Sequence, residues 1–471
     1  MSKRDPRFPA MLRALACGIA GLLTAFTFSL LSCGALYAEE GAPTTFPAMW
    51  YPNIPAWFPQ LLGAQATLIY QNMPAYHSPY VGQDSLRFDH GLGQEMSQTY
   101  GVYLGSQISR DFQTYLDVEM FQGQGLSKGI GLGGYPNGDV IRSGPMDLGK
   151  APYLARLFGR YLIPLSGETG DQIERGMDQL PGKEPADRIE IKGGKLTPTD
   201  DFDLNRYANN QRTQFLNYAF LYNPAWDYAS DTRGYSIGAS VAVVHPSWRL
   251  VLGSYQEPTV ANGYLLDDQI YHARGDNLEL TVKPFGATVI RLLAFRNEGQ
   301  MGDFRDAMAA ASGTVPDITS VSQPGHVKYG FGVNLEQPLA DEGETGLFAR
   351  AGWANGTNAT WCFTEVDRSA SLGVQVSGSH WVRPDDRFGM AYGIEGLSGS
   401  HRHYLEEGGI GMVIGDGALN YGLEQVFEAY YRIQLGPYVQ LSPDYQHIWN
   451  PAYNKARGPV DIYGLRLRVS Y

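Results

Sequence analysis

The last eight residues, Gly464–Tyr471, read GLRLRVSY, and their side chains alternate in character. In a β-strand successive side chains point to opposite sides. One face of this strand would carry only apolar residues: Leu465, Leu467 and Val469. The other face would carry Arg466 and Arg468, and the strand ends on the aromatic Tyr471. A strand with lipid on one side and a wet lumen on the other is typical of a transmembrane β-barrel.

The same alternation recurs along most of the chain, in about seventeen segments. They are residues 62–70, 97–108, 111–120, 152–163, 188–196, 213–222, 234–244, 247–256, 278–284, 288–296, 328–337, 345–353, 370–379, 387–395, 423–435, 437–448 and 460–471. Bacterial outer-membrane barrels generally have an even number of strands. We therefore predict about 16 strands, with one segment over-read or split.

A soluble β-sandwich or β-helix would also alternate, so the length of the segments decides between the folds. Strands of soluble proteins average about five or six residues, whereas about ten are needed to cross a bilayer at a tilt. Aromatic residues also lie near the segment ends, as membrane interfaces require. The predicted fold class is all-β: a transmembrane antiparallel β-barrel with short periplasmic turns and long extracellular loops.

The predicted connections fall into two length classes. Tight turns are expected at 109–111, 245–246 and 435–437. Long loops are expected at 71–96, 121–151, 197–212, 257–277, 297–327, 354–369 and 396–422. Residues 303–311, DFRDAMAAA, could form one or two helical turns inside a loop. Short turns at one rim and long loops at the other are the outer-membrane arrangement.

The composition excludes two classes of protein. Of 471 residues, 43% are hydrophobic and 18% are charged, so the chain can bury a large core and is not globally disordered. The net charge of -12 and the pI near 5.2 exclude nucleic acid as a partner, because an acidic surface repels phosphate.

The N-terminus has the pattern of an export signal. Basic residues precede an apolar run over 14–31, and small residues follow before an acidic stretch. We expect cleavage after Ala38, with cleavage after Ala35 as the alternative. Lipidation at Cys33 and a retained membrane anchor are further alternatives.

The predicted domain organisation is a signal peptide (1–38), a leading segment (39–60) and a single outer-membrane barrel (61–471). Removing 1–38 takes away four basic residues and one acidic residue, so the mature chain has a net charge of -12 - 3 = -15. The mature chain keeps one cysteine, Cys362, and one thiol cannot form an internal disulfide. Localisation in the bacterial outer membrane follows from the signal and the barrel together.

The inward faces of the predicted strands carry charges of both signs. A path for a hydrophilic solute needs carboxylates, amides and guanidiniums that bind weakly enough for the solute to leave. The candidates for this path on the strands are Asp117, Glu119, Asn334, Glu336, Arg350, Glu428, Arg432, Asp444, Arg466 and Arg468. For any one of them, a solvated or mutually paired charge on the wall is the alternative.

Four blocks of the sequence resemble the carbohydrate-selective outer-membrane porin family. They are LTPTDDFDLNRYANNQRTQFLNYAF (196–220), GLFARAGWANG (346–356), HRHYLEEGGIGMVIGDGALNYGLEQVFEAYYR (401–432) and DYQHIWNPAYNKARGPVDIYGLRLRVSY (444–471). The resemblance extends from about residue 60 to the end. It implies a barrel of about sixteen strands and passive uptake of sugars.

Two other blocks make the solute less certain. AYHSPYVGQDSL (75–86) and EMFQGQGLSKGIGLGGYPNG (119–138) resemble a branch of that family associated with manganese uptake. Manganese prefers oxygen ligands, which an acidic lumen could supply. A manganese porin of the same fold is therefore the alternative to a sugar porin.

The block DFDLNRYANNQR (201–212) could fold inward as a constriction. The family resemblance favours this reading, whereas spacing alone indicates only a polar turn. The candidates in this loop are Asn205, Arg206, Asn209 and Arg212. If carboxylates such as Asp117 dominate the narrowest point, the pore should favour cations. If arginines balance them, the surface suits neutral polyols.

Other functions find little support in the residues. His401 and His403 form an isolated pair, either a weak metal-site candidate or an ordinary exposed loop. No Cys pair, HExxH motif or nucleophile with a placed His can be recognised. We therefore predict neither a cofactor nor a metal nor an enzyme; a barrel enzyme and a closed adhesin or receptor remain the competing classes.

The predicted function is a porin for passive diffusion of small hydrophilic solutes, most of all carbohydrates. Its expected partners are the solute (a sugar, or Mn²⁺ in the alternative), outer-membrane lipid, and the barrel assembly machinery, which would read the strand that ends at Tyr471. The sequence leaves open whether the barrel is a monomer or a trimer.

Overall fold

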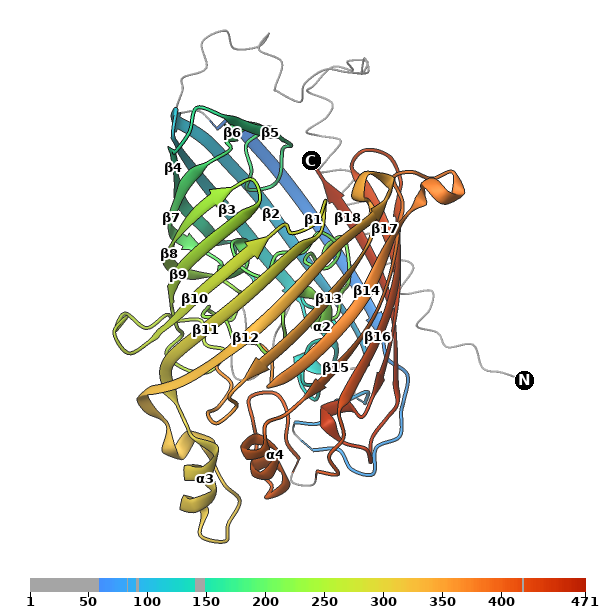
Figure 1. The fold of residues 1–471 in the computed structure, drawn as a ribbon. Coiled ribbons are helices and arrows are strands. Elements are labelled where there is room, and N and C mark those ends of the chain that lie inside the picture. The colour runs from blue at the N-terminus through green and yellow to red at the C-terminus, as the bar shows by residue number, and fades with distance from the viewer. Residues whose placement is uncertain (1–58, 83, 90–92, 140–148, 417–418) are drawn as a thin grey trace, which may run out of the picture. The chain divides into compact units, whose positions relative to one another are not determined.

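The structure is a computed structural model that describes residues 59–82, 84–89, 93–139, 149–416 and 419–471. Within these residues, sixteen antiparallel strands close into a barrel, so the predicted fold class is confirmed. Figure 1 shows the strands following one another around the wall, with the last strand beside the first. The expected signal peptide, 1–38, lies outside the described residues.

The wall strands are β1 (Leu61–Asn72), β2 (Gln94–Ser109), β3 (Phe112–Gly123), β4 (Tyr153–Pro164), β7 (Arg188–Leu196), β8 (Ser236–His245), β9 (Trp248–Gln256), β10 (Arg274–Val282), β11 (Val289–Met301), β12 (Gln323–Ala340), β13 (Thr345–Ala354), β14 (Arg368–Ser377), β15 (Arg387–Gly396), β16 (Glu424–Gln434), β17 (Val439–Trp449) and β18 (Val460–Ser470). A separate two-stranded sheet pairs β5 (Thr169–Ile173) with β6 (Gly182–Pro185). The α-helices are α2 (Tyr218–Leu221), α3 (Phe304–Ala311) and α4 (Gly399–Glu406). Short 3₁₀ turns are η1 (Leu126–Gly129), η2 (Pro198–Asp200), η3 (Ile318–Val321), η4 (Asp341–Gly343), η5 (Gly378–Trp381) and η6 (Pro451–Tyr453).

The barrel closes where β1 pairs with β18. The register places Gln65 opposite Ser470 and Asn72 opposite Tyr463. Beyond the last strand residue, the backbone N–H of Tyr471 donates to the carbonyl of Ala64 at 2.9 Å. Closure removes the free sheet edges that would otherwise expose unpaired backbone groups in lipid.

The two faces of the wall differ as the alternation predicts. Large apolar side chains point outwards, and Leu252, Phe331 and Leu372 are 58%, 56% and 61% exposed. Charged side chains on the same strands point inwards, and Lys328 and Glu428 are fully buried. An apolar outer surface of this kind is stable only against lipid, because exposing apolar surface to water costs about 25 cal/mol per Å².

The two rims of the barrel carry different connections. Very short turns join β2 to β3, β8 to β9 and β16 to β17, as predicted. The opposite rim carries the long loops, and the helix α3 predicted over 303–311 lies there beside α4 (Figure 1). The rim with short turns is the periplasmic one. Its exception is the connection from β4 to β7, residues 165–187, which contains β5 and β6.

One predicted strand is wrong. Residues 213–222 alternate in sequence, but they contain the helix α2 and lie in a long connection, 197–235, between β7 and β8. Tyr218 to Leu221 are all buried, so this segment has no lipid-facing side. Of the seventeen segments predicted from the sequence, this one is not a strand, and the other sixteen are the strands of the barrel. None of the helices in the described part of the chain is long and apolar enough to cross a membrane.

Candidate functional site

The connection between β7 and β8, residues 197–235, folds into the barrel, and we call it the inward loop. Its large side chains are buried, and Phe202, Tyr207, Phe215 and Trp226 are at most 1% exposed. The loop starts with Thr197 as the N-cap of η2, whose side chain accepts from the backbone of Thr199. The expected loop 197–212 is therefore only the first part of a longer segment that fills the lumen.

Wall side chains satisfy backbone groups of the inward loop. Glu428 of β16 accepts hydrogen bonds from the backbone N–H groups of Leu216 and Asn217, the second at 2.9 Å. Arg466 of β18 donates to the carbonyls of Gln211 and Gln214 at 2.6 and 2.7 Å. A buried segment without regular structure needs such partners, because an unpaired backbone group costs about as much as a lost hydrogen bond.

Asp203 is the most heavily bonded anchor of the inward loop. The Arg350 Nε lies 3.1 Å from Asp203 Oδ2, and Arg350 also donates to the carbonyl of Phe220 at 2.8 Å. Asn334 of β12 donates to Asp203 Oδ1 at 2.7 Å and accepts from Asn205 at 2.7 Å. The Arg350 side chain is 1% exposed, so this ion pair is buried between the loop and β13.

Glycines on the wall allow the inward loop to approach closely. Gly332 of β12 lies opposite Gly352 of β13 in the register, and the side chain of Asn223 lies between them. A Cβ at Gly352 would be 1.8 Å from Asn223 Oδ1, and one at Gly346 would be 2.2 Å from the ring of Tyr207. Any larger residue at these positions would push the loop away from the wall.

A narrow cavity of about 100 Å³ remains beside the inward loop, and we call it the constriction. Ligand pockets usually have volumes of about 300–1,000 Å³, so this space is too small to enclose a solute of the usual ligand size. Its lining includes guanidinium groups, hydroxyls, aromatic rings and one carboxylate: Phe121, Asp139, Arg156, Thr197, Thr199, Arg212, Tyr218, Tyr222, Tyr228, Arg233, Tyr235 and Phe363.

Arg212 reaches from the inward loop to β3, two strands away from β7 in the wall. Its Nη1 lies 2.8 Å from Glu119 of β3, and its Nε lies 2.8 Å from Asp139. The hydroxyl of Tyr103 accepts a further hydrogen bond from Arg212 at 3.0 Å. These partners fix the guanidinium and neutralise its charge at the constriction.

Two more arginines face the constriction. Arg156 of β4 lies 3.1 Å from Asp117 and 2.8 Å from Asp200 of the inward loop. The guanidinium of Arg233 lies over the ring of Tyr153, 4.6 Å from its centroid. Cations with nearby carboxylates and aromatic rings form a surface that both donates hydrogen bonds and stacks on apolar faces.

A larger cavity of about 410 Å³ lies among the extracellular loops. Its lining is mostly apolar and includes Phe304, Ile318, Trp361 and Met412. Trp361 and Phe363 lie on the same loop, and Phe363 lines the constriction. This loop therefore borders both the outer cavity and the constriction.

The helix α4 is fixed to these loops by His401. Its Nδ1 lies 3.0 Å from Asp367 and its Nε2 lies 3.1 Å from Glu365, and all three side chains are 1% exposed. Burial lowers the pKa of His401, but the two carboxylates outweigh it and raise that pKa to about 9. The pKa of Asp367, which burial alone would raise, falls to about 2 because of His401. His403 lies on the same helix but is exposed.

The predicted site residues occupy three kinds of position. Arg212 lines the constriction, and Asp117 and Glu119 lie behind it as the partners of Arg156 and Arg212. A second group contacts the inward loop or lies within it: Asn205, Asn209, Asn334, Glu336, Arg350, Glu428 and Arg466. Asp444 accepts from Gln446, which in turn accepts from Asn217 of the loop.

The remaining predicted residues lie towards the periplasmic end. Arg206 forms an ion pair with Glu344 at 2.9 Å, next to the turn that joins β12 to β13. Arg432 lies opposite Arg387 near the end of β16. Arg468 donates to the sulfur of Met177 at 3.6 Å. None of these three arginines lines the constriction in the described part of the chain.

The expectation that Arg466 faces a wet lumen is wrong. Its side chain does point inwards, but it is 1% exposed and bonded to the inward loop. Arg350 is likewise committed to Asp203 rather than to solvent. Alternation tells which face of a strand a side chain takes, and it does not tell what fills the barrel. The reading of residues 401–403 as an exposed loop is wrong too, because they lie in α4 and His401 is buried.

Sequence reasoning missed most residues of the constriction. Arg156 lies in the segment 152–163 that was recognised as a strand, so its inward face could have been read from the alternation. Arg233, Tyr228 and Phe363 lie in irregular loops, and no period in the sequence marks them. Their placement follows from how the inward loop packs against the wall.

A closed sixteen-stranded barrel, apolar outside and narrowed inside by its own loop, defines an outer-membrane channel. Its sequence gives the family as well. Residues 155–471 match the sequence profile of the carbohydrate-selective porin, OprB family. The chain therefore belongs to this family of outer-membrane porins.

Two known proteins are similar to it. The QuiX protein of Acinetobacter baylyi, a proposed porin, is 26% identical in an alignment of 311 positions that covers 60% of this chain and 66% of QuiX. The match therefore spans just under two thirds of that relative. The high-pH structure of Pseudomonas putida OprB superimposes with a TM-score of 0.63 at 15% identity, covering 87% of this chain and 93% of OprB. At that identity the structural likeness supports the fold alone.

The alternatives to a sugar porin gain no support. None of these matches names manganese, so the manganese reading has nothing behind it beyond the two short blocks of resemblance. Among the described residues, no group of three or more His, Cys, Asp or Glu side chains is placed to hold a metal ion. The family and the fold are those of channels rather than of enzymes.

Proposed function

We propose that the constriction selects uncharged, polyhydroxylated solutes of the sugar type. The observation that carries this proposal is the lining itself: Arg156, Arg212 and Arg233 stand among aromatic rings. Guanidinium groups donate hydrogen bonds to hydroxyls, and aromatic rings cover the apolar faces of a sugar ring. Both kinds of contact are weak enough singly to let the solute leave.

The charge balance of the constriction favours a neutral solute over an ion. Arg212 is paired with Glu119 and Asp139, and Arg156 is paired with Asp117 and Asp200. A wall with one dominant sign would concentrate ions of the opposite sign. A paired wall offers donors and acceptors without a large net field, which agrees with the second of the two selectivity hypotheses.

Block of ion current by sugars in a planar bilayer tests the proposal. Sugars should reduce the wild-type current in a saturable way, because a bound sugar obstructs ions. Arg212→Ala should weaken this block about tenfold, which corresponds to one charge-assisted hydrogen bond. Arg206→Ala is the matched control, since Arg206 lies in the same loop but at the periplasmic end, and it should leave the block unchanged.

Two results would contradict the proposal. In the first, sugars fail to block the wild-type current at any concentration while Mn²⁺ blocks at micromolar levels, which would revive the manganese alternative. In the second, Arg206→Ala weakens the block as much as Arg212→Ala, which would place the sugar elsewhere in the barrel. Liposome swelling with a panel of sugars then identifies the preferred solute.

We also infer that the barrel assembly machinery recognises the end of β18. Tyr471 ends the chain next to β18, and its ring is half exposed towards the outside of the barrel. It contacts the ring of Tyr438 with a centroid distance of 5.8 Å. The assembly machinery would recognise an outer-membrane barrel by the aromatic residue at the end of its last strand.

A further inference from the structure

The connection between β4 and β7, residues 165–187, breaks the rule that periplasmic turns are short. The longest other turn at that rim runs only from 378 to 386. The connection contains the hairpin β5–β6, and we call it the periplasmic hairpin. Figure 1 shows it at the rim where the chain ends, opposite the helices α3 and α4.

The tip of the periplasmic hairpin, residues 175–180, turns into the barrel. Leu180 is 7% exposed, and its backbone N–H donates to the hydroxyl of Tyr115 of β3 at 3.3 Å. Arg175 donates to the carbonyl of Leu62 of β1, and its guanidinium lies 5.6 Å from the ring centroid of Tyr471. The tip therefore contacts β1 and β3 of the wall and the C-terminal Tyr471.

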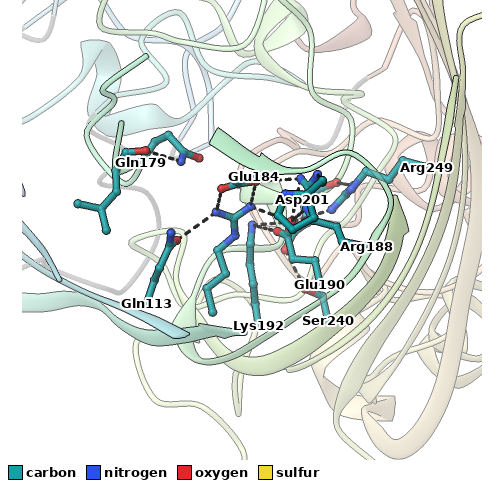
Figure 2. A network of polar contacts seen from close by, with 12 residues as sticks. Gln113, Gln179, Glu184, Arg188, Glu190, Lys192, Asp201, Ser240 and Arg249 are labelled. Carbon is teal, nitrogen blue, oxygen red and sulfur yellow. Dashed lines mark hydrogen bonds and ion pairs between the residues drawn. The ribbon is translucent and has the colours of Figure 1, made fainter. Parts of the chain in front are cut away.

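The stem of the hairpin is held by a chain of alternating charges (Figure 2). Glu184 of β6 binds Arg160 of β4, which also lies 2.8 Å from Glu190 of β7. Lys192 then lies 3.5 Å from Glu190 and 2.8 Å from Asp201 of the inward loop. Salt bridges of this kind contribute most when several charges form a network. This one connects the periplasmic hairpin to the inward loop.

The two segments meet a second time at Arg156. Its guanidinium lies 2.8 Å from Asp200 of the inward loop and 3.4 Å from Asp178 at the hairpin tip. Arg156 is in the extracellular third of β4, whose periplasmic end is Pro164. A hairpin that starts at the periplasmic rim therefore reaches deep into the barrel, to a residue that lines the constriction.

We propose that the periplasmic hairpin is a second narrowing of the transport path, on its exit side, and that Asp178 at its tip is a selectivity-determining residue. The proposal rests on the constriction described above as the entrance side of the same path. A solute that passes Arg156 next meets the carboxylate of Asp178. The Arg156 guanidinium then faces three carboxylates, those of Asp117, Asp178 and Asp200, and this local surplus of negative charge disfavours anions at the exit and leaves neutral polyols free to pass.

Two variants test the proposal in planar bilayers. In the first, residues 168–186 are replaced by a short Gly-Ser turn, which should raise the single-channel conductance about twofold or more, because the exit widens. In the second, Asp178→Asn keeps the hairpin but removes its charge, and it should shift the reversal potential in a salt gradient towards anions. Asp171→Asn is the matched control, since Asp171 is exposed on the hairpin stem.

Accessibility provides an independent readout. In a Cys362→Ser background, Asp178→Cys should react with a charged thiol reagent added from the periplasmic side and should lose conductance on reaction. The proposal is overturned if the shortened, heat-modifiable barrel keeps the wild-type conductance. It is also overturned if Asp178→Asn and Asp171→Asn have the same reversal potential as the wild type.

These outcomes are separable from a failure of the sugar proposal. If sugars never block the current, the assignment of the constriction to sugars fails, but the conductance increase on shortening the hairpin still measures an exit narrowing. If sugars block and the shortened barrel conducts like the wild type, only the hairpin proposal fails. Should the shortened barrel not fold, Asp178→Asn and the thiol reaction decide the question.

Discussion

In the barrel wall, side chains alternate between lipid and interior, whereas in the inward loop nearly every large side chain is buried. Phe331 and Lys328 illustrate the wall: the first is 56% exposed to the outside and the second is fully buried inside. Phe215 and Trp226 of the inward loop have no outside face at all. The wall therefore needs the right polarity at each position, while the loop needs particular partners.

This difference changes how substitutions should act. A lipid-facing wall position tolerates any side chain of suitable polarity, because lipid does not require one shape. A contact between the loop and the wall, such as Asp203 with Arg350 or Asn217 with Glu428, has one geometry, and its loss leaves a buried polar group unpaired. Substitutions in the wall should affect whether the barrel assembles, and substitutions at loop anchors should affect how it conducts.

Arg350→Ala should have the largest effect on the inward loop. It removes one partner of a buried ion pair and leaves Asp203 partly uncompensated, which typically costs about 3–5 kcal/mol. We expect a barrel that stays heat-modifiable but conducts more current, because the loop detaches from β13. Single-channel recording measures this. Arg206→Ala is the control, since Arg206 is partly exposed, and equal conductance in the two variants would show that Arg350 does not anchor the loop.

Leu465→Arg tests the wall. Leu465 is 40% exposed on the outer face at the middle of β18, where a charge in lipid costs about 2–4 kcal/mol. Folded yield in the outer membrane should fall, whereas Leu467→Arg, nearer the interface, should reduce it less. Heat-modifiability on gels measures the yield. A reversed order for the two variants would mean that the depth assigned to them is wrong.

Alkaline pH should loosen α4. The pKa of His401, about 9 in the folded protein, is above the ordinary 6.5, so its stabilisation is complete below pH 6.5 and is lost as pH rises through 9. The loss is at most about 3–4 kcal/mol, from about 1.4 kcal/mol for each of the roughly 2.5 pH units between 6.5 and 9. Asp367, with a pKa of about 2, keeps its stabilising charge above about pH 4 and loses it only as pH falls through 2.

Trypsin cleavage at Arg402 reports on this helix. Arg402 is exposed on α4, so cleavage there should accelerate between pH 7 and 9.5 relative to cleavage at Arg110, which lies in a periplasmic turn. His401→Gln should remove the relative acceleration. If the ratio of the two cleavage rates stays constant with pH, His401 is not what holds α4.

Deletion of Tyr471 should have the smallest effect. It removes two backbone hydrogen bonds with Ala64 at the barrel seam, each worth about 1 kcal/mol. Folded yield in the outer membrane should fall modestly while the conductance of the folded fraction stays normal. Replacement by Phe, which keeps an aromatic end, should restore the yield. An unchanged yield on deletion would remove the proposed role in assembly.

The wall could be predicted from the sequence because the face that each residue takes depends only on its neighbours along the strand. Leu465 and Arg466 differ in polarity, and a period of two residues places them on opposite faces whatever surrounds the strand. Segment 213–222 misled the same argument because Leu216, Tyr218 and Phe220 recur at every second position, yet the segment lies in the interior of a barrel. A large barrel supplies a second buried environment that a period of two cannot distinguish from a strand face.

The constriction could be predicted only in part. Arg212 was identified through family resemblance, since spacing alone marks a polar turn. Arg233 and Phe363 come together from two loops that are far apart in the sequence, and only the packing against the wall joins them. The periplasmic hairpin could not be predicted from the sequence, because residues 165–187 neither alternate over ten residues nor form a tight turn.

The paired glycines at 332 and 352 restrict which substitutions this part of the wall can accept. Even the methyl group of alanine at Gly352 would overlap Asn223. Glycines on the inner wall therefore mark the positions that the inward loop contacts. A scan that replaces each inward glycine by alanine should find tolerant and intolerant positions, and the intolerant ones should trace the outline of the inward loop on the strands. Shortening the loop at Asn223 should then make Gly332 and Gly352 replaceable, so the two sites can vary only together.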